Sequence, residues 1–491
     1  MPDLTITQHL AEEAKNAERA AKLNWDKLDM QLSYAGRTIT LPEDPAKMPL
    51  KEAIKTLQRF EKDENTEVQV HEIIDAYPLD AAVAFVKAMQ RLYGWASPVA
   101  TPGFFGPKPP SYIGVKVGKN KEDVVQCPMG SFMLPGVSRR IETGIYPQSK
   151  TSQVFIIHGV VLQKEKKIIL ELATETRRIV EAESIYRGKA VRVTLDEDDA
   201  FTTNNPPEFM DTSAVSEASL VFNDDITSQI NTNILVPIKH TAICKQNNIP
   251  MKRGILLEGP YGTGKSLTAA MVARVCEENG WTFILLNRVQ GLKAVLEFAN
   301  RFRPAVVFAE DVDRVAAERD EAMNDLINTI DGVVSKRSEV MTILTTNHAD
   351  RLNPVILRPG RLDAVISLKA PDQETVKRLI AHYAGSLLPK NADLDASARE
   401  LAGQIPASIR ECVERAKLGM IGRGDNKLSD HDILIAAQTM KNHLALLNKD
   451  KTVKSTAEVL ADSLKKVVQN GSGEKIENIH KQVEDIHSSV C

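Results

Sequence analysis

The feature that most constrains this 491-residue chain is a glycine-rich octapeptide, Gly-Pro-Tyr-Gly-Thr-Gly-Lys-Ser, at residues 259–266. It follows the apolar run Gly-Ile-Leu-Leu at 254–257, so the local order is a buried strand, a turn and a helix. Glycines let consecutive backbone N–H groups curl around an anion at a helix N-terminus. Lys265 can then reach the β- and γ-phosphates of a nucleotide, and the Ser266 hydroxyl can hold Mg²⁺. The pattern predicts nucleotide binding.

A second apolar run, Ala-Val-Val-Phe-Ala at 305–309, ends in the acids Glu310 and Asp311. A strand beside the phosphate loop can deliver one carboxylate to the Mg²⁺ shell and another to the attacking water. Taken alone, this segment would be a buried strand with solvated acids at its end. Its combination with the upstream loop favours the functional interpretation.

Two further segments carry suitable chemistry. The run 343–347 ends in Asn347, whose amide can help to position a water against the γ-phosphate; alone it would be an ordinary turn residue. Arg358 and Arg361 flank a rigid Pro-Gly turn, which suits guanidinium groups aimed at transition-state charge. An isolated turn of this kind is more often a surface feature with structural ion pairs.

Together with residues 324–333, these segments resemble the ATPase module of the AAA family, within the AAA+ superfamily, over roughly 220–446. The stretch 345–363 resembles the second region of homology that separates AAA proteins from other phosphate-loop enzymes. The resemblance implies an ATPase, which converts ATP and water to ADP and phosphate, with ATP and Mg²⁺ as cofactors. Residues 1–210 show no family resemblance.

The resemblance also implies site roles. Glu310 would be the metal-side acid, which shares Mg²⁺ with Ser266, while Asp311 would be the catalytic acid and Asn347 sensor 1. Arg358 and Arg361 would reach into the neighbouring subunit's site, which implies self-association into a ring, most often a hexamer. The residues implied to bind nucleotide are Asp225, Ile226, Gly259, Pro260, Tyr261, Gly262, Thr263, Gly264, Lys265, Ser266, Leu267, His382 and Ala407; of these, Asp225, Ile226, His382 and Ala407 would line the adenine and ribose pocket.

The chain departs from the family pattern in two places. The usual acid order is Asp-Glu, whereas this chain has Glu310 followed by Asp311, with Asp313 still in register. A misplacement of about 1 Å can cost a hundredfold in rate, so slow turnover is compatible with the exchange, and hydrolysis is still expected. The connection at 283–293 is shorter than usual in ring translocases, and no aromatic residue follows Asn287, where their pore loop belongs.

The fold class expected is α/β: a phosphate-loop AAA+ parallel sheet flanked by helices plus an all-helical lid, preceded by a helical region and a small β-rich (α+β) module. Helices are expected at 7–33, 50–62, 79–93 and 172–184, and an extended stretch at 67–74. The expected domains are an N-terminal helical/α+β region at 1–95, a Pro/Gly linker at 96–111, a β-rich substrate or adaptor module at 112–210, the large AAA+ subdomain at 218–370, the helical lid at 371–446 and a C-terminal tail with a short helix at 447–491.

Composition excludes several classes of protein. A net charge of −3 predicts no polyanion or membrane partner, and the five cysteines lack the spacing of disulfide frameworks or zinc sites. The N-terminus lacks the pattern of a secretory signal, and no long apolar run could span a membrane. We therefore expect a cytoplasmic protein.

The leading functional hypothesis is an ATP-driven remodeller that binds a protein substrate or adaptor through its N-terminal modules. One alternative is an unfoldase that threads peptide with a minimal pore loop at 288–290. Another is an assembly or scaffold protein switched by ATP binding. A nucleic-acid motor is possible but not favoured; its candidate patch consists of Lys108, Lys116, Lys119 and Lys121.

Overall fold

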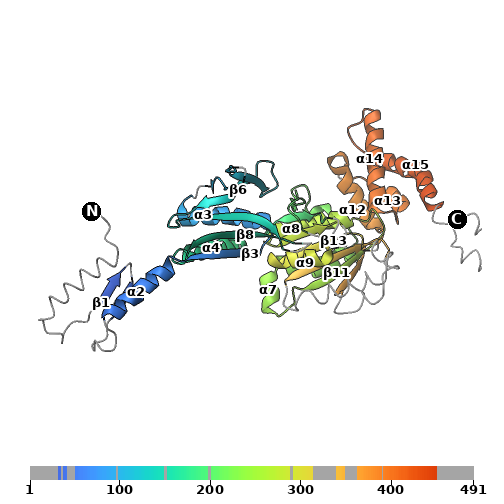
Figure 1. Cartoon of the computed structure of the whole chain (residues 1–491). Helices are drawn as coiled ribbons and strands as arrows, with labels where there is room; N and C mark the ends of the chain where they lie inside the picture. The colour runs from blue at the N-terminus through green and yellow to red at the C-terminus, as the bar shows by residue number, and fades with distance from the viewer. Residues whose placement is uncertain are drawn as a thin grey trace, which may run out of the picture. The chain divides into compact units, whose positions relative to one another are not determined.

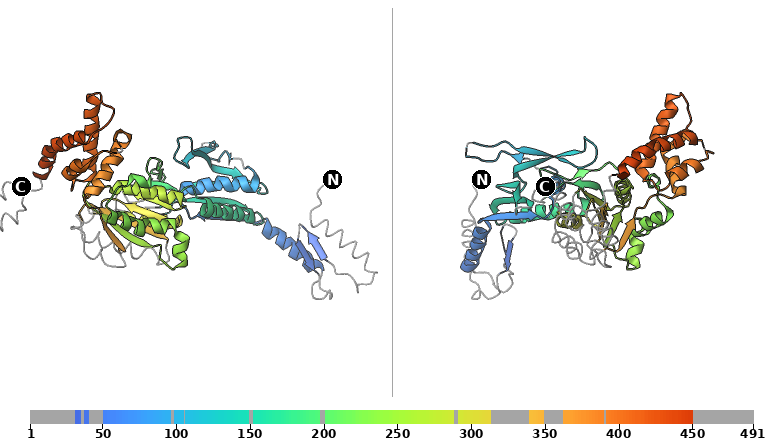
Figure 2. Two further views of the ribbon diagram at one scale, coloured as in Figure 1. Left: turned by 180° about the vertical axis from the view of Figure 1, so that it is seen from behind. Right: turned by 90° about the vertical axis from the view of Figure 1, so that its right-hand side faces the viewer.

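The computed structural model of the chain describes residues 31–34, 37–40, 50–95, 98–104, 106–148, 152–196, 201–287, 291–312, 339–348, 362–389 and 391–449 (Figures 1 and 2). These residues divide between two compact units. Unit 1 comprises 1–217, 228–259 and 265–367, and unit 2 comprises 218–227, 260–264 and 368–491. Residues 7–30 of the helix expected at 7–33, and the tail beyond residue 449, lie outside the described residues. The end of that prediction is wrong, because Gln31–Tyr34 is the strand β1, whose residues pair with β2 instead of continuing a helix.

Seven of the described strands of unit 1 form a sheet in the order β10-β9-β12-β13-β14-β11-β15, in which all pairs except the antiparallel β10–β9 pair are parallel. Its strands are β9 Ala190–Val193, β10 Glu208–Phe209, β11 Arg253–Glu258, β12 Thr282–Leu286, β13 Ala305–Ala309, β14 Val340–Thr346 and β15 Ala364–Ser367. Every residue of β12, β13 and β14 is buried, as parallel strands covered on both faces require.

The order of these strands determines where the site can form. The crossovers β11–α8–β12 and β12–α9–β13 run in opposite directions along the sheet, so right-handed connections place α8 Lys265–Glu278 and α9 Leu292–Arg301 on opposite faces. Strands β13, β14 and β11 are neighbours and parallel, so their carboxyl ends meet at one edge. The phosphate loop, the two acids and Asn347 all follow these ends.

The N-terminal part of unit 1 is an antiparallel sheet with two helices packed against it (Figure 1). Its described strands are β3 Glu67–Ile74, β8 Gln153–Leu162, β7 Arg140–Pro147, β6 Val124–Met133 and β4 Pro98–Val99 in spatial order, with β5 Ser111–Lys116 also paired to β6. The helices are α3 Pro78–Tyr93 and α4 Lys166–Glu183. Phe85 lies at the centre of the core, 5.2 Å from Phe132 and 5.6 Å from Phe155 between ring centroids.

Several local predictions are confirmed in this region. The helices expected at 50–62 and 79–93 are α2 Leu50–Glu64 and α3, and the extended stretch at 67–74 is β3. The helix expected at 172–184 begins earlier, at Lys166. The range 112–210 is shared between two sheets, because β9 and β10 pair with the parallel sheet rather than with the antiparallel one. The remaining elements of unit 1 include the hairpin β1 Gln31–Tyr34 and β2 Arg37–Thr40, the π-helical turn Asn231–Leu235, α6 Val236–Lys239 and α7 Thr241–Gln246.

Unit 2 is mainly helical, with α12 Gln373–Ala384, α13 Asp395–Leu401, α14 Pro406–Gly422 and α15 Asp430–Lys449. Each long helix starts at a recognisable signal. Asp372 caps α12 by accepting from the Thr375 N–H at 2.8 Å. Pro406 is in the first turn of α14, and Ser429 and Asp432 exchange hydrogen bonds at the start of α15.

The fold class expected from the sequence is confirmed. Among the described residues, no helix is both long enough and apolar enough to cross a membrane.

A buried carboxyl group makes the stability of unit 1 depend on pH. Asp80 is 1% exposed and accepts from Ser184 Oγ at 2.6 Å and from the Ile185 N–H at 3.0 Å. Burial raises the pKa of this carboxyl to about 6, above the value of about 3.9 for an exposed aspartate. The folded state thus binds this proton more tightly than the unfolded state does. The contribution of Asp80 to the free energy of unfolding is therefore most favourable at low pH and declines as pH rises from about 4 to about 6.

We predict that Asp80→Asn removes this dependence, since the amide keeps a hydrogen-bonding oxygen but carries no charge. Between pH 4 and pH 7, the free energy of unfolding of the variant should rise relative to that of the wild type by on the order of 3 kcal/mol, with no further relative rise above pH 7. The unfolding midpoints of both proteins, measured across this range, test the prediction. A difference that stays constant with pH would contradict it.

Candidate functional site

The loop between β11 and α8 depends on three glycines with positive φ: Gly259, Gly262 and Gly264 at 153°, 80° and 105°. A Cβ at Gly262 would lie 2.8 Å from the Cβ of Ala407 and 3.0 Å from Cδ1 of Ile405. The Ala407 N–H also donates to the carbonyl oxygen of Gly262 at 3.2 Å. A side chain at position 262 would therefore need both an unfavourable backbone conformation and displacement of the start of α14.

Lys265, the first residue of α8, has only 9% of its surface exposed. Its Nζ donates to the carbonyl oxygen of Gly259 at 2.6 Å and to Oδ1 of Asn347 at 2.8 Å. The Gly259 N–H in turn donates to the carbonyl oxygen of Thr346 at 3.2 Å. The end of β11 and the end of β14 are thus joined through one ammonium group and one backbone hydrogen bond.

The first residue of α8 after the lysine faces the strand that carries the acids. Ser266 Oγ donates to Oε1 of Glu310 at 2.8 Å. A hydroxyl and a carboxylate this close are the kind of oxygen pair that Mg²⁺ accepts, with its other ligands supplied by water and phosphate. Among the described residues no cluster of three or more His, Cys, Asp or Glu could hold a metal without such help. These residues fit a magnesium–nucleotide complex.

Asp311 is held by three contacts with the neighbouring strand. Its carboxylate Oδ1 accepts from Asn347 Nδ2 at 2.9 Å, its N–H donates to Thr345 Oγ1 at 3.1 Å, and the next N–H, of Val312, donates to the Thr345 carbonyl oxygen at 2.9 Å. Its φ is 54°, a left-handed conformation that costs a non-glycine residue roughly 1–2 kcal/mol. The contacts with β14 stabilise this turn and direct the carboxylate toward Asn347.

The other expected nucleotide-binding residues differ in exposure. Thr263 is buried and donates to the carbonyl oxygen of Pro260 at 2.8 Å, whereas Tyr261 is 64% exposed and Leu267 is 38% exposed.

Within unit 2, Ile226 is buried, while Asp225 and His382 are exposed. Arg358 and Arg361 lie outside the described residues, as does Asp313.

The structure adds residues that the motifs did not single out. Thr345 is 1% exposed, and its hydroxyl and carbonyl oxygens accept from the N–H groups of Asp311 and Val312. The ring of Phe222 would lie 3.3 Å from a Cβ at Gly264. Arg378, on α12, donates to the carbonyl oxygen of Phe222 at 2.8 Å and to Asp224 Oδ1 at 3.0 Å. A threonine hydroxyl and an arginine outside any motif give no signal in a single sequence.

Comparison with known proteins identifies the family of this region. Residues 255–370 match the family described as "ATPase family associated with various cellular activities (AAA)". The proteasome-activating nucleotidase of Methanocaldococcus jannaschii is 28% identical over 307 residues, which cover 54% of this chain and 70% of the relative. The protein of the same name from Methanococcus vannielii is 26% identical over 317 residues, which cover 56% of this chain and 76% of the relative. Residues 255–370 therefore form an AAA ATPase domain, and the chain is an ATP-binding and ATP-hydrolysing protein distantly related to the proteasome-activating nucleotidases.

Proposed function

We propose that this ATPase works as a ring, most simply a hexamer, that remodels or disassembles a protein target recognised by its N-terminal modules. The observation that most supports a working ATPase cycle is the hydrogen-bonded series Lys265–Asn347–Asp311, which lies at the same sheet edge as the Ser266–Glu310 pair. A series of this kind links the group that binds phosphate to the group that would act on water.

In this proposal each side chain has one task. The loop N–H groups and Lys265 bind the phosphates, and Ser266 and Glu310 hold Mg²⁺. The ion, when bound, neutralises charge on the β- and γ-phosphate oxygens. Asp311 orients the attacking water and accepts its proton, while Asn347 keeps the Asp311 carboxylate at a set distance from Lys265. Asp225, Ile226, His382 and Ala407 would surround the base and ribose.

The inverted acid order is compatible with these roles. Glu310 has the longer side chain, and it reaches the Ser266 hydroxyl at 2.8 Å. Asp311 has the shorter side chain, and its left-handed backbone together with the Asn347 amide holds its carboxylate at the site. We infer that backbone adjustment at Asp311 compensates for the missing methylene group, so that the rate loss stays within about a hundredfold.

The first test of these roles is Asp311→Asn. The amide preserves the shape and a hydrogen bond to Asn347 but cannot accept a proton, so steady-state ATP turnover should fall by roughly 10²–10⁴-fold with nucleotide affinity little changed. Turnover and nucleotide binding, measured separately, check this outcome.

Glu310→Gln is the matched control, because it should raise the Mg²⁺ concentration needed for half-maximal turnover. If Asp311→Asn turns over ATP at the wild-type rate, the catalytic assignment is wrong. If Glu310→Gln lowers turnover to the extent expected of Asp311→Asn, while the Mg²⁺ concentration for half-maximal turnover stays unchanged, the two acids have the opposite roles.

The ring arrangement predicts that active sites are shared between subunits. Arg361→Ala should lower turnover by roughly 10³-fold or more, because the guanidinium group that would stabilise transition-state charge in the neighbouring subunit is lost, while each protomer still binds nucleotide. Mixing this variant with Asp311→Asn should restore part of the activity, since some interfaces then combine an intact aspartate with an intact arginine. Turnover of the mixture, with co-purification of differently tagged subunits to prove that rings mix, is the measurement. Mixed rings without any regained activity would sink the shared-site proposal.

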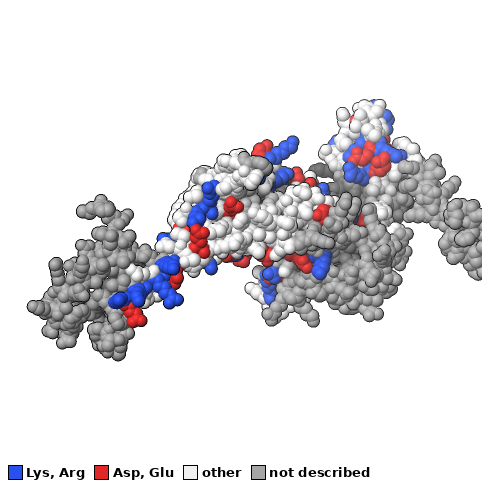
Figure 3. All heavy atoms as spheres, in the orientation of Figure 1, with Lys and Arg blue, Asp and Glu red and all other residues white. Residues whose placement is uncertain are grey.

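The choice of a protein target has two supports. The relatives are named as nucleotidases that activate the proteasome, which associates them with protein degradation. The alternative nucleic-acid patch has little support, because Lys119 Nζ lies 3.9 Å from Asp211 Oδ1, and the face drawn in Figure 3 carries acidic as well as basic side chains.

Peptide threading is the second candidate function, and the names of the two relatives, proteasome-activating nucleotidases, also favour it. Its minimal pore loop, 288–290, lies outside the described residues. Degradation of a tagged folded protein with a partner peptidase would support threading, whereas ATP-dependent disassembly of a complex with intact subunits would support remodelling.

A further inference from the structure

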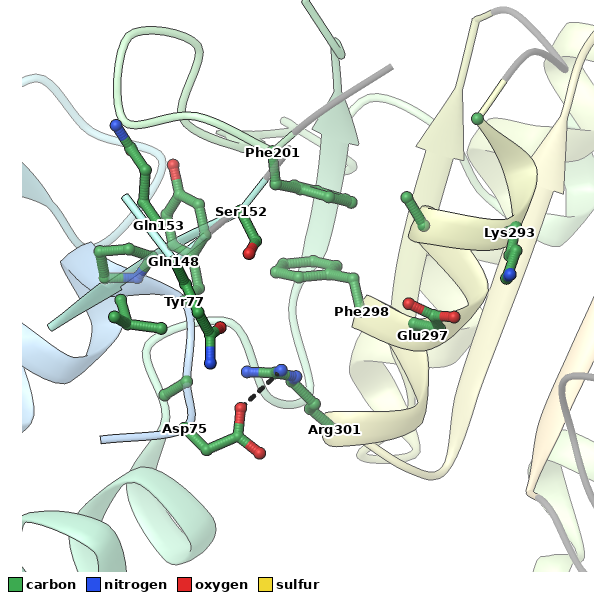
Figure 4. Close-up of a pocket in the computed structure, with 15 residues that line it drawn as sticks. Asp75, Tyr77, Gln148, Ser152, Gln153, Phe201, Lys293, Glu297, Phe298 and Arg301 are labelled. Atoms are coloured by element: carbon green, nitrogen blue, oxygen red, sulfur yellow. Dashed lines mark hydrogen bonds and ion pairs between the residues drawn. The ribbon is translucent and has the colours of Figure 1, made fainter. Parts of the chain in front are cut away.

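A cavity of about 430 Å³ lies within unit 1, away from the nucleotide site, between the antiparallel module and helix α9 (Figure 4). We call it the module pocket. The side formed by the antiparallel sheet and its helices comprises Asp75, Ala76, Tyr77, Pro78, Gln148, Ser152, Gln153 and Val154, and the ATPase side comprises Gly291, Lys293, Ala294, Glu297, Phe298 and Arg301. Phe201, from the connection between β9 and β10, completes the lining. Its size lies in the range typical of ligand pockets, roughly 300–1,000 Å³.

One wall of the module pocket is aromatic and already assembled. The rings of Phe201 and Phe298 stack with centroids 4.6 Å apart and planes 21° from parallel. Figure 4 draws both side chains. Tyr77 meets both rings edge-on, at 6.4 and 6.0 Å, and its hydroxyl donates to the carbonyl oxygen of Thr202 at 2.9 Å. Because Tyr77 and Phe298 are buried, this wall is rigid and needs little ordering before an apolar side chain can pack on it.

The remaining lining mixes small apolar residues with polar and charged ones, and its charged side chains sum to zero. Lys293 and Arg301 are balanced by Asp75 and Glu297, and Arg301 Nη2 lies 2.8 Å from Asp75 Oδ1. A polyanion is bound by an excess of positive charge, which this lining does not have. The amide side chains of Gln148 and Gln153 can instead bond to a peptide backbone. Oε1 of Gln153 already accepts from the Thr203 N–H at 3.0 Å, so Gln153 would act through its Nε2 donor.

Helix α9 connects this pocket to the catalytic edge of the sheet. Its buried residues Leu292, Val295, Leu296 and Ala299 belong to the core shared with β13, the strand that ends at Glu310 and Asp311, while Lys293, Ala294, Glu297 and Arg301 line the pocket. Arg187 of the module donates to the carbonyl oxygens of Arg301 and Arg303 at 3.0 and 2.8 Å, which fastens the end of α9. A ligand in the pocket would therefore contact an element that also supports the ATPase site.

We propose that the module pocket binds a short extended segment of an unfolded polypeptide. One apolar or aromatic side chain of the segment packs on Phe201 and Phe298, and its neighbouring peptide groups bond to Gln148 and Gln153. The inference rests on the proposed protein-remodelling function and adds a holding site in the N-terminal half of the chain, separate from any pore loop.

The test fills the pocket instead of removing its wall. Ala294 is half-buried and lines the cavity, so the indole of Ala294→Trp can occupy the space that the peptide side chain needs. Asn300→Trp places the same side chain on the same helix at a half-buried position that does not line the pocket, and it serves as the control. Neither residue belongs to the nucleotide site, so ATP turnover without peptide should be unchanged in both.

The probe is a fluorescein-labelled Gly/Ser-rich dodecapeptide with one central Phe, titrated with the full chain and followed by anisotropy. Ala294→Trp should weaken binding at least tenfold, Asn300→Trp should leave it unchanged, and replacing the Phe of the probe by Ser should have an effect similar to that of Ala294→Trp. A single-stranded oligothymidine of the same length should not compete. Phe201→Ala, which shortens the wall, is a second variant in case the tryptophan variant melts early.

The inference is overturned if Ala294→Trp and Phe201→Ala both bind the probe as tightly as the wild type, if the Phe-free probe binds equally well, or if oligothymidine displaces it. An ATP-dependent disassembly assay separates this failure from that of the proposed function. Wild-type and Ala294→Trp proteins of equal disassembly activity would leave remodelling standing without the pocket. Pocket-dependent peptide binding without any ATP-dependent remodelling would leave the pocket standing without the proposed function.

Discussion

The structure around the phosphate loop depends on the buried ammonium group of Lys265. An ion with so little exposure is unfavourable unless it is hydrogen-bonded, and this one is satisfied by the Gly259 carbonyl oxygen and the Asn347 side chain. Those partners belong to the ends of β11 and β14, so the same contacts that neutralise the charge fix the spacing of the two strand ends. The three positive-φ glycines of the segment before Lys265 adopt backbone conformations that residues with a side chain rarely take.

The two acids divide the remaining contacts of the site between them. Glu310 bonds to the hydroxyl of Ser266 at the start of α8, and Asp311 bonds to Asn347 at the end of β14. The turn between them is achieved by a left-handed residue whose N–H is received by Thr345. The exchanged order of the two acids therefore occurs together with a local backbone conformation that positions the second acid.

The features that could be predicted from the sequence are those determined by a few consecutive residues. The strand–loop–helix at 254–266, the buried strand before Glu310 and the helix expected at 79–93 each carry their signal within a few residues. The membership of Ala190–Val193 in the parallel sheet could not be predicted, because a short β-type run pairs with whichever strand edge the complete fold offers. The same is true of Phe201 against Phe298 and of Thr345 beside Asp311, which are brought together by packing between distant segments.

Strand β9 has a mechanical consequence. It leaves the antiparallel module and pairs in register with β12, and the Gly188 N–H before it donates to Thr282 Oγ1 at 3.0 Å. A domain joined by a flexible linker can move independently of the ATPase domain. The antiparallel sheet here is instead followed by a strand that belongs to the ATPase sheet, so the two cannot move independently at that connection. Any tilt of β12 during a nucleotide cycle would therefore move β9 with it, and through β9 the antiparallel sheet that precedes it in the chain.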